Sequence, residues 1–204
     1  MKFFLLVSLC RAHISQGLST VMLTALVTFA GPHGAAGSTM AVKEPANGAL
    51  FTAFVSVLRH PRCMNCHSNG DFPRQGDDGH PHTMNVRRGT EGHGVTAEKC
   101  GTCHQDHNLS ESHLPPGAPN WALPPARTPM IWQGLSDAQL CRSIKDPKQN
   151  KNRTIDQLVE HLTEDKLVMW GWNPGEGRTP IPMLHEEFVT KVKQWQAAGA
   201  PCPN

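Results

Sequence analysis

The chain has 204 residues and a formal net charge of +2, from 19 lysines and arginines against 17 aspartates and glutamates. No run of basic residues stands out, so the charge pattern argues against a nucleic-acid-binding protein. Apolar residues make up only 38% of the chain, which also contains 18 glycines and 17 prolines. We therefore expect a thin protein core and much irregular backbone.

The first 41 residues are predicted to be a secretory signal peptide. They contain two basic residues, no acidic ones, and a small-residue end around Ala36 and Ala41. The apolar run over 18–30 has 13 residues, short of the roughly 20 that a membrane-spanning helix needs. We therefore expect export to the periplasm, no stable membrane anchor, and one domain over residues 42–204. Without residues 1–41 the charge balance is 17 basic against 17 acidic residues.

The first predicted helix covers residues 49–59, where apolar side chains recur with the helical period. Pro61 is expected to end this helix, directly before a cysteine-containing motif. Residues 68–95 are rich in glycine, aspartate and histidine and have no period, so we expect a loop there.

Six prolines between residues 114 and 130 predict an extended, stiff segment. Beyond it, capping-box sequences begin two predicted helices, 136–146 and 154–163. A last helix is predicted over 185–198, with an inward apolar stripe and Gly199 as its stop. No strand pattern of any length is present. The predicted fold class is mostly α with extensive irregular chain and little or no sheet.

Two copies of Cys-x-x-Cys-His stand at 63–67 and 100–104. Two thiols three residues apart on one turn can reach the two vinyl groups along one haem edge, and the next histidine can then point at the iron. With these motifs and the helix that enters the first of them, the chain resembles c-type cytochromes. The resemblance implies two covalently bound haem c groups in a small dihaem cytochrome c-like domain. It assigns the proximal iron ligands to His67 and His104. The thioether bonds it assigns to Cys63, Cys66, Cys100 and Cys103.

The same cysteines leave a second interpretation open. Two Cys-x-x-Cys pairs separated by 37 residues would also suit a zinc ribbon with four cysteine ligands. Zinc ribbons are mostly cytosolic and do not require a histidine after each pair. The two histidines and the predicted export signal therefore favour haem over zinc.

The number of cysteines outside the two motifs predicts one disulfide. Apart from Cys10 in the predicted signal peptide and the four motif cysteines, Cys141 and Cys202 remain. An even remainder in an exported protein favours pairing. The alternative is that Cys141 is a small buried hydrophobic residue.

The ligand on the far side of each iron sets its reduction potential, and several residues are candidates. Met130 follows a proline and precedes a helix, which resembles the methionine ligand loop of small cytochromes c; the alternative is core packing beside Trp132. His82 is 15 residues beyond His67 and 22 before His104, so its loop can swing over either iron. The further candidates are His80, His107, His161 and Met183.

Apart from the two motifs, the sequence contains no further motif that indicates a particular chemistry. The chain has no nucleophile paired with a base, no glycine-rich nucleotide loop and no metal-binding helix motif. We therefore predict an electron-transfer protein without catalytic residues, not an enzyme, that carries single electrons in the periplasm. Within the cytochrome resemblance, dihaem proteins of this size often accept electrons from a larger enzyme. The implied redox partner proteins are a dehydrogenase or molybdoenzyme and the respiratory chain. The alternative is a dihaem peroxidase-like enzyme with one open haem site.

Overall fold

The computed structural model describes residues 48–111 and 113–204, which belong to one compact unit. The predicted signal peptide, 1–41, lies outside the described residues. Helices take up 37% of the described region and strands 5%, which confirms a mostly helical fold with little sheet. None of the described helices is both long and apolar enough to cross a membrane.

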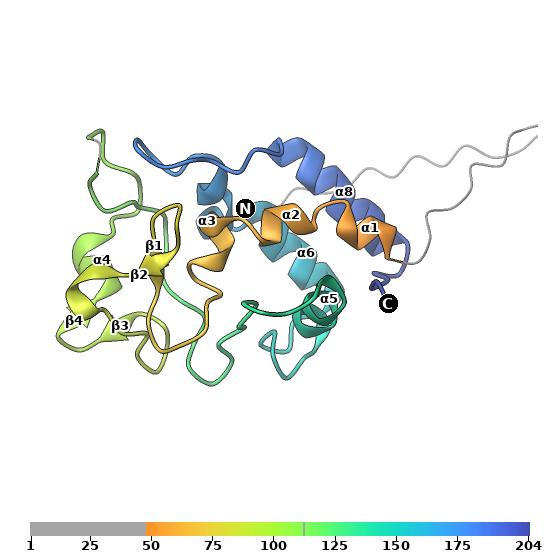
Figure 1. Cartoon of the computed structure of the whole chain (residues 1–204), viewed down its shortest axis with the longest axis horizontal. Coiled ribbons are helices and arrows are strands. Elements are labelled where there is room, and N and C mark those ends of the chain that lie inside the picture. The colour runs from red at the N-terminus through yellow and green to blue at the C-terminus, as the bar shows by residue number, and fades with distance from the viewer. Residues whose placement is uncertain (1–47, 112) are drawn as a thin grey trace, which may run out of the picture. The chain divides into compact units, whose positions relative to one another are not determined.

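Short helices surround the two motifs, and longer ones follow in the carboxyl-terminal half (Figure 1). The α-helices are α1 Ala49–Thr52, α2 Val55–Leu58, α3 Pro61–Met64, α4 Cys100–Cys103, α5 Asp137–Lys145, α6 Ile155–Glu164, α7 Lys166–Met169 and α8 His185–Ala197. The 3-10 helices are η1 Thr83–Asn85 and η2 Trp170–Trp172. The strands form two antiparallel pairs, β1 Arg74–Gln75 with β2 His80–Pro81, and β3 Gly94–Val95 with β4 Glu98–Lys99.

The segment before the first motif is broken into short helices, where the sequence predicted one helix over 49–59. At Phe54 the backbone leaves the helical region, with φ −127° and ψ 0°. Phe51 and Phe54 are both fully buried, and their ring centroids lie 5.9 and 5.7 Å from that of Trp195. The break therefore accompanies the packing of both phenylalanines on one tryptophan, a distant contact that the apolar period did not reveal.

Pro61 begins a helix, although the sequence predicted that it would end one. It is the first residue of α3. At this position the backbone N–H would have no partner within the helix, so proline loses no hydrogen bond, and its fixed φ suits the helix. The side chain of His60 caps α3 by accepting a hydrogen bond from the backbone N–H of Arg62. Since α3 contains Cys63, the proline sets where the turn of the first motif starts.

Both predicted capping boxes are present. At the start of α5, the hydroxyl of Ser136 accepts from the backbone N–H of Gln139, whose side-chain oxygen accepts from the backbone N–H of Ser136. Thr154 and Gln157 make the same pair of bonds at the start of α6. The ends of both helices lie within one residue of the prediction.

The last helix, α8, also agrees with its prediction. Phe188, Val192 and Trp195 form its buried stripe, while Val189, which was expected to join them, is half-buried. Gly199 follows the helix with φ +81°, a left-handed conformation that glycine adopts without strain. The stripe packs into the core together with side chains of α1, α2, α5 and α6.

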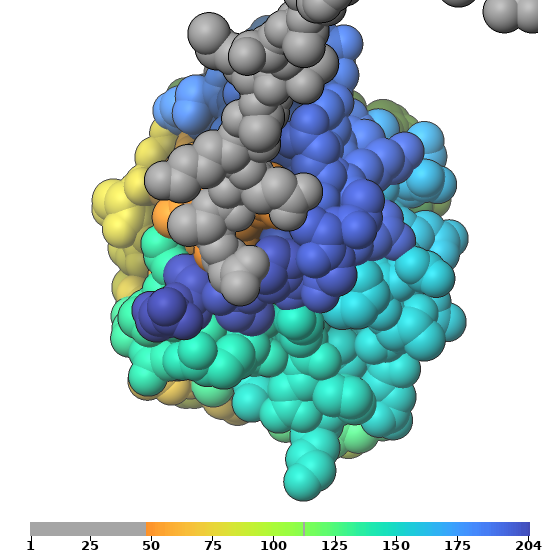
Figure 2. Space-filling model, turned by 90° about the vertical axis from the view of Figure 1, so that its right-hand side faces the viewer, coloured from red at the N-terminus to blue at the C-terminus, as the bar shows by residue number. Residues whose placement is uncertain are grey.

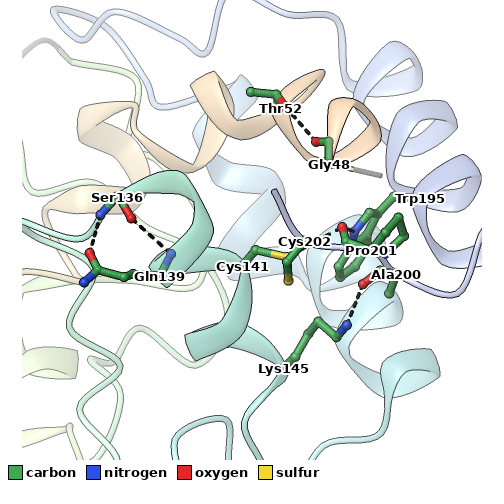
Figure 3. The surroundings of a disulfide bond; sticks show 10 residues. All are labelled: Gly48, Thr52, Ser136, Gln139, Cys141, Lys145, Trp195, Ala200, Pro201 and Cys202. Atoms are coloured by element: carbon green, nitrogen blue, oxygen red, sulfur yellow. Dashed lines mark hydrogen bonds between the residues drawn. A yellow bond between two sulfur atoms is a disulfide. The ribbon is translucent and has the colours of Figure 1, made fainter. Parts of the chain in front are cut away.

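The carboxyl terminus is tied to α5 by the predicted disulfide between Cys141 and Cys202, whose Cα atoms lie 5.5 Å apart (Figure 3). The side-chain nitrogen of Lys145 donates to the carbonyl of Ala200 at 2.5 Å in the same region. In Figure 2 the dark blue carboxyl-terminal residues lie against the green segment that contains α5. A covalent bond and a hydrogen bond therefore join the chain end to this helix.

The predicted loop over 68–95 is irregular apart from the two-residue strands and the 3-10 helix η1. Arg88 is only 2% exposed and donates to the carbonyls of Pro124, at 2.7 Å, and Gly70, at 3.1 Å. One buried guanidinium thus joins the loop after the first motif to the proline-rich segment.

Candidate haem-binding sites

The first motif forms one helical turn at the end of α3. The backbone N–H groups of Cys66 and His67 both donate to the carbonyl of Cys63, at 3.2 and 3.1 Å. The two thiols and the imidazole are therefore held on one short piece of ordered backbone. No disulfide joins the two cysteines, whose thiols are free.

His67 is held by two independent contacts. Its Nδ1 lies 2.9 Å from the carbonyl oxygen of Met130, and since a carbonyl only accepts, Nδ1 carries the proton. The imidazole also stacks on Trp132, with centroids 3.6 Å apart and 3° between the planes. Burial lowers the pKa of His67 to about 3, and the nearby His161 contributes to this shift. The ring is therefore neutral, with the Nε2 lone pair available to a metal.

A cavity of about 310 Å³ adjoins the first motif. Its wall contains both cysteines and His67 among mainly apolar side chains, including Leu58, Leu158, Leu162, Trp170, Trp172 and Phe188. Burial raises the pKa of Cys63 to about 12 and that of Cys66 to about 11, so both thiols are protonated at neutral pH. An apolar cavity beside two thiols and a neutral imidazole fits a haem, which needs an apolar surface and an axial nitrogen.

Arg62 contributes a buried cation to the wall of this cavity. It is 7% exposed and forms an ion pair with Asp77. Its guanidinium lies 5.7 Å from the ring centroid of Trp170. The Nε atom has no hydrogen-bond partner among residues 48–111 and 113–204. A buried guanidinium that keeps one N–H group unsatisfied besides its ion pair fits an anionic group such as a haem propionate.

The histidine of the second motif is held by the same kinds of contact as that of the first. Cys100 and Cys103 lie on α4, and the backbone N–H of His104 donates to the carbonyl of Cys100 at 2.9 Å. Nδ1 of His104 donates to the carbonyl of Pro116 at 2.6 Å, and the ring stacks on Trp121 with centroids 4.4 Å apart and planes 6° apart. Burial lowers the pKa of His104, so its Nε2 lone pair is likewise available at neutral pH.

His82 lies beside His104 at a distance that suits a shared metal. The two ring centroids are 6.2 Å apart, with 65° between the planes. With metal–nitrogen bonds of about 2 Å, two imidazoles on one metal have their centroids about 6 Å apart. Nδ1 of His82 donates to the carbonyl of Thr83 at 2.7 Å, so Nε2 carries the lone pair. The sequence left open which motif His82 serves, and the structure brings it to the second.

The other candidate ligands lie in different surroundings. Met130 is buried at the Nδ1 edge of His67, where its carbonyl accepts the hydrogen bond from the ring. His161 lines the cavity of the first motif, and its Nδ1 lies 2.9 Å from Oδ2 of Asp165. The remaining candidates are either exposed or packed against the hydrophobic core: His80, His107 and Met183.

The stacked tryptophans were not anticipated from the sequence. Trp121 lies in the proline-rich segment and Trp132 directly after it. This shared location is the sequence feature that could have pointed to these two tryptophans. Trp121 also lines the cavity of the first motif and meets Trp170 edge to face, with centroids 4.9 Å apart. The side chain that supports His104 is therefore also part of the wall of the other site.

Comparisons with protein-family models, with curated proteins and with solved structures return no match for this chain. The local geometry of the two motifs is therefore the basis on which its function is proposed.

Proposed function

We propose that the protein is a dihaem c-type cytochrome, with a small cytochrome c-like architecture, that carries single electrons. The observation that carries this proposal is the matched support of His67 and His104. Each donates from Nδ1 to a backbone carbonyl and stacks on a tryptophan. A histidine whose far nitrogen is held in this way is oriented for metal binding through Nε2.

The roles of the chain's residues follow from this proposal. Covalently bound haem c supplies one-electron chemistry at its iron. His67 and His104 act as proximal ligands, and His82 ligates from the other side at the second motif. Arg62 holds a propionate at the first motif. The thioether bonds come from Cys63, Cys66, Cys100 and Cys103.

The arrangement of the cysteines supports haem over a zinc ribbon. Among residues 48–111 and 113–204, no group of three or more histidine, cysteine, aspartate or glutamate side chains is placed to hold one metal ion. Four cysteine ligands of a ribbon would form such a group. Two separate Cys-x-x-Cys-His turns, each with its own supported histidine, instead suit two separate cofactors.

We infer that the protein works in the periplasm. The disulfide between Cys141 and Cys202 is typical of proteins from oxidising compartments, which agrees with the predicted signal peptide. The resemblance to cytochromes c implies that a dehydrogenase or molybdoenzyme donates the electrons. An acceptor of the respiratory chain then receives them.

Haem counting tests the proposal. Expression in a bacterium with active cytochrome c maturation should give a red protein with two haems per chain, measured by pyridine haemochrome spectra and intact mass. The double variants Cys63→Ala/Cys66→Ala and Cys100→Ala/Cys103→Ala should each retain one haem. A colourless protein whose four motif thiols are free or bound to zinc would contradict the proposal.

A peroxidase-like enzyme needs one haem with an open or displaceable site. The proximity of His82 to His104 supports a filled site at the second motif and so favours a carrier. Carbon monoxide separates the two functions, because it binds reduced haem only where a coordination position is open. The reduced carrier should not bind it at neutral pH, whereas binding at one haem would favour the peroxidase.

A further inference from the structure

His161 lies on the wall of the cavity that also contains His67. It belongs to α6, next to Leu158 and Leu162, which are 3% and 5% exposed and line the same cavity. One face of this helix thus places an imidazole among the apolar side chains beside the first motif.

The imidazole of His161 is supported in the manner of a metal ligand. Its Nδ1 lies 2.9 Å from Oδ2 of Asp165, one helical turn later. Oδ1 of Asp165 accepts from the backbone N–H of Leu167 at 2.9 Å, so the carboxylate is itself oriented. With the carboxylate of Asp165 accepting the hydrogen bond, Nδ1 of His161 is the donor and the lone pair lies on Nε2.

Met130 also lines this cavity, but the position of its backbone makes it a less suitable ligand of the same metal. Its carbonyl accepts the hydrogen bond from Nδ1 of His67, so its backbone lies at the ring edge that faces away from a metal bound at Nε2. Trp132, two residues later, covers one face of the same imidazole. This segment supports the proximal histidine from behind, whereas a sixth ligand must approach from the opposite side of the metal.

The cavity wall contains two further nitrogen donors, His93 and Lys151, and both are exposed. The carbonyl of His93 accepts from the backbone N–H of Cys100 at 3.1 Å, which places this residue at the second motif. Neither side chain has the half-buried position on a helix and the carboxylate support of His161.

We propose that His161 is the sixth ligand of the haem bound at the first motif and that Asp165 positions it. The inference rests on the proposed dihaem function. Together with His82 and His104 at the second motif, it gives both haems two histidine ligands. Since methionine ligation raises the potential of a haem, both haems would then have lower potentials than a histidine–methionine cytochrome.

The unaltered protein provides the first test. The oxidised holoprotein should give low-temperature EPR signals of two bis-histidine low-spin haems and no methionine-to-iron charge-transfer band in the far red. A methionine band with the intensity of one haem would overturn the inference. This measurement needs no variant and so does not depend on how a substitution affects folding.

A matched pair of variants provides the second test. His161→Ala should retain two haems and convert one of them to a high-spin form that binds carbon monoxide, and added imidazole should restore its low-spin signal. Met130→Leu should leave both low-spin signals unchanged. The inference fails if His161→Ala keeps both low-spin signals or if Met130→Leu loses one.

Haem content separates this inference from the function on which it rests. A protein without attached haem would end the dihaem proposal itself. Two attached haems with a methionine signature at one of them would leave that proposal intact and overturn only the role of His161.

Discussion

His67 and Trp132 lie ring against ring, with centroids 3.6 Å apart and planes 3° apart, and the backbone N–H of Trp132 donates to the carbonyl of His67 at 2.9 Å. A stacking contact and a hydrogen bond therefore join the histidine of the first motif to a segment far along the chain. His104 and Trp121 repeat the stacking at the second motif. The orientation of each proposed iron ligand thus depends on a residue outside its motif.

Trp132→Ala should weaken both the fold and the orientation of His67. Trp132 is 5% exposed, and truncation of a buried tryptophan costs about 3–5 kcal/mol of unfolding free energy. The EPR anisotropy of one haem should change because the imidazole loses the surface that fixes its rotation. Guanidinium unfolding and EPR measure the two effects. Trp121→Ala is the matched variant at the second motif; Trp121 stacks on His104 and also lines the first cavity, so the larger change should be at the other haem. Identical spectra for the two variants would contradict this account.

Loss of the disulfide should destabilise the protein without loss of haem. The bond joins Cys141 and Cys202 across a sequence separation of 61 residues, and a loop of this length corresponds to about 4 kcal/mol in the chain-entropy model. The variant Cys141→Ala/Cys202→Ala should unfold at lower guanidinium concentration and still carry two haems. Dithiothreitol should lower the stability of the unaltered protein but not that of the variant. An unchanged midpoint would show that the bond does not constrain the unfolded chain.

The thiols of the first motif should react slowly in the chain without haem. The thiolate is the reactive form, and burial raises the pKa of Cys63 to about 12 and of Cys66 to about 11, so little thiolate is present at neutral pH. Iodoacetamide should therefore modify the exposed Cys103 first, as followed by peptide mass spectrometry.

The rate at Cys63 should rise about tenfold per pH unit until the pH approaches its pKa of about 12. Similar rates at all four motif thiols would mean that the cavity does not form before haem is attached.

His82→Ala should open the second site. The ring of His82 lies 6.2 Å from that of His104, so its removal should leave one haem high-spin and able to bind carbon monoxide when reduced. Met84→Leu, at a residue that is 75% exposed, is the matched control from the same segment and should leave the spectra unchanged. Two intact low-spin signals in His82→Ala would assign the sixth position to another residue.

The elements that were predicted well depend on short-range interactions. The two capping boxes place the starts of α5 and α6 because each is a pair of hydrogen bonds within four residues, and both helices follow the prediction to within one residue. The disulfide followed from cysteine parity alone. The helix over 49–59 was wrong because the packing of Phe51 and Phe54 on Trp195, far along the chain, goes with a break at Phe54.

The sequence by itself determined the six residues proposed to bind haem, because the attachment chemistry requires a fixed local spacing. Only the tertiary structure decided that His82 lies at the second motif, that Met130 supports His67 through its carbonyl, and that His161 lines the first cavity. These contacts bring together groups that are far apart in the chain and are joined by irregular segments rich in glycine and proline. Such segments have no helical or strand period that would show where they lead, so packing and not local pattern decides which distant groups meet.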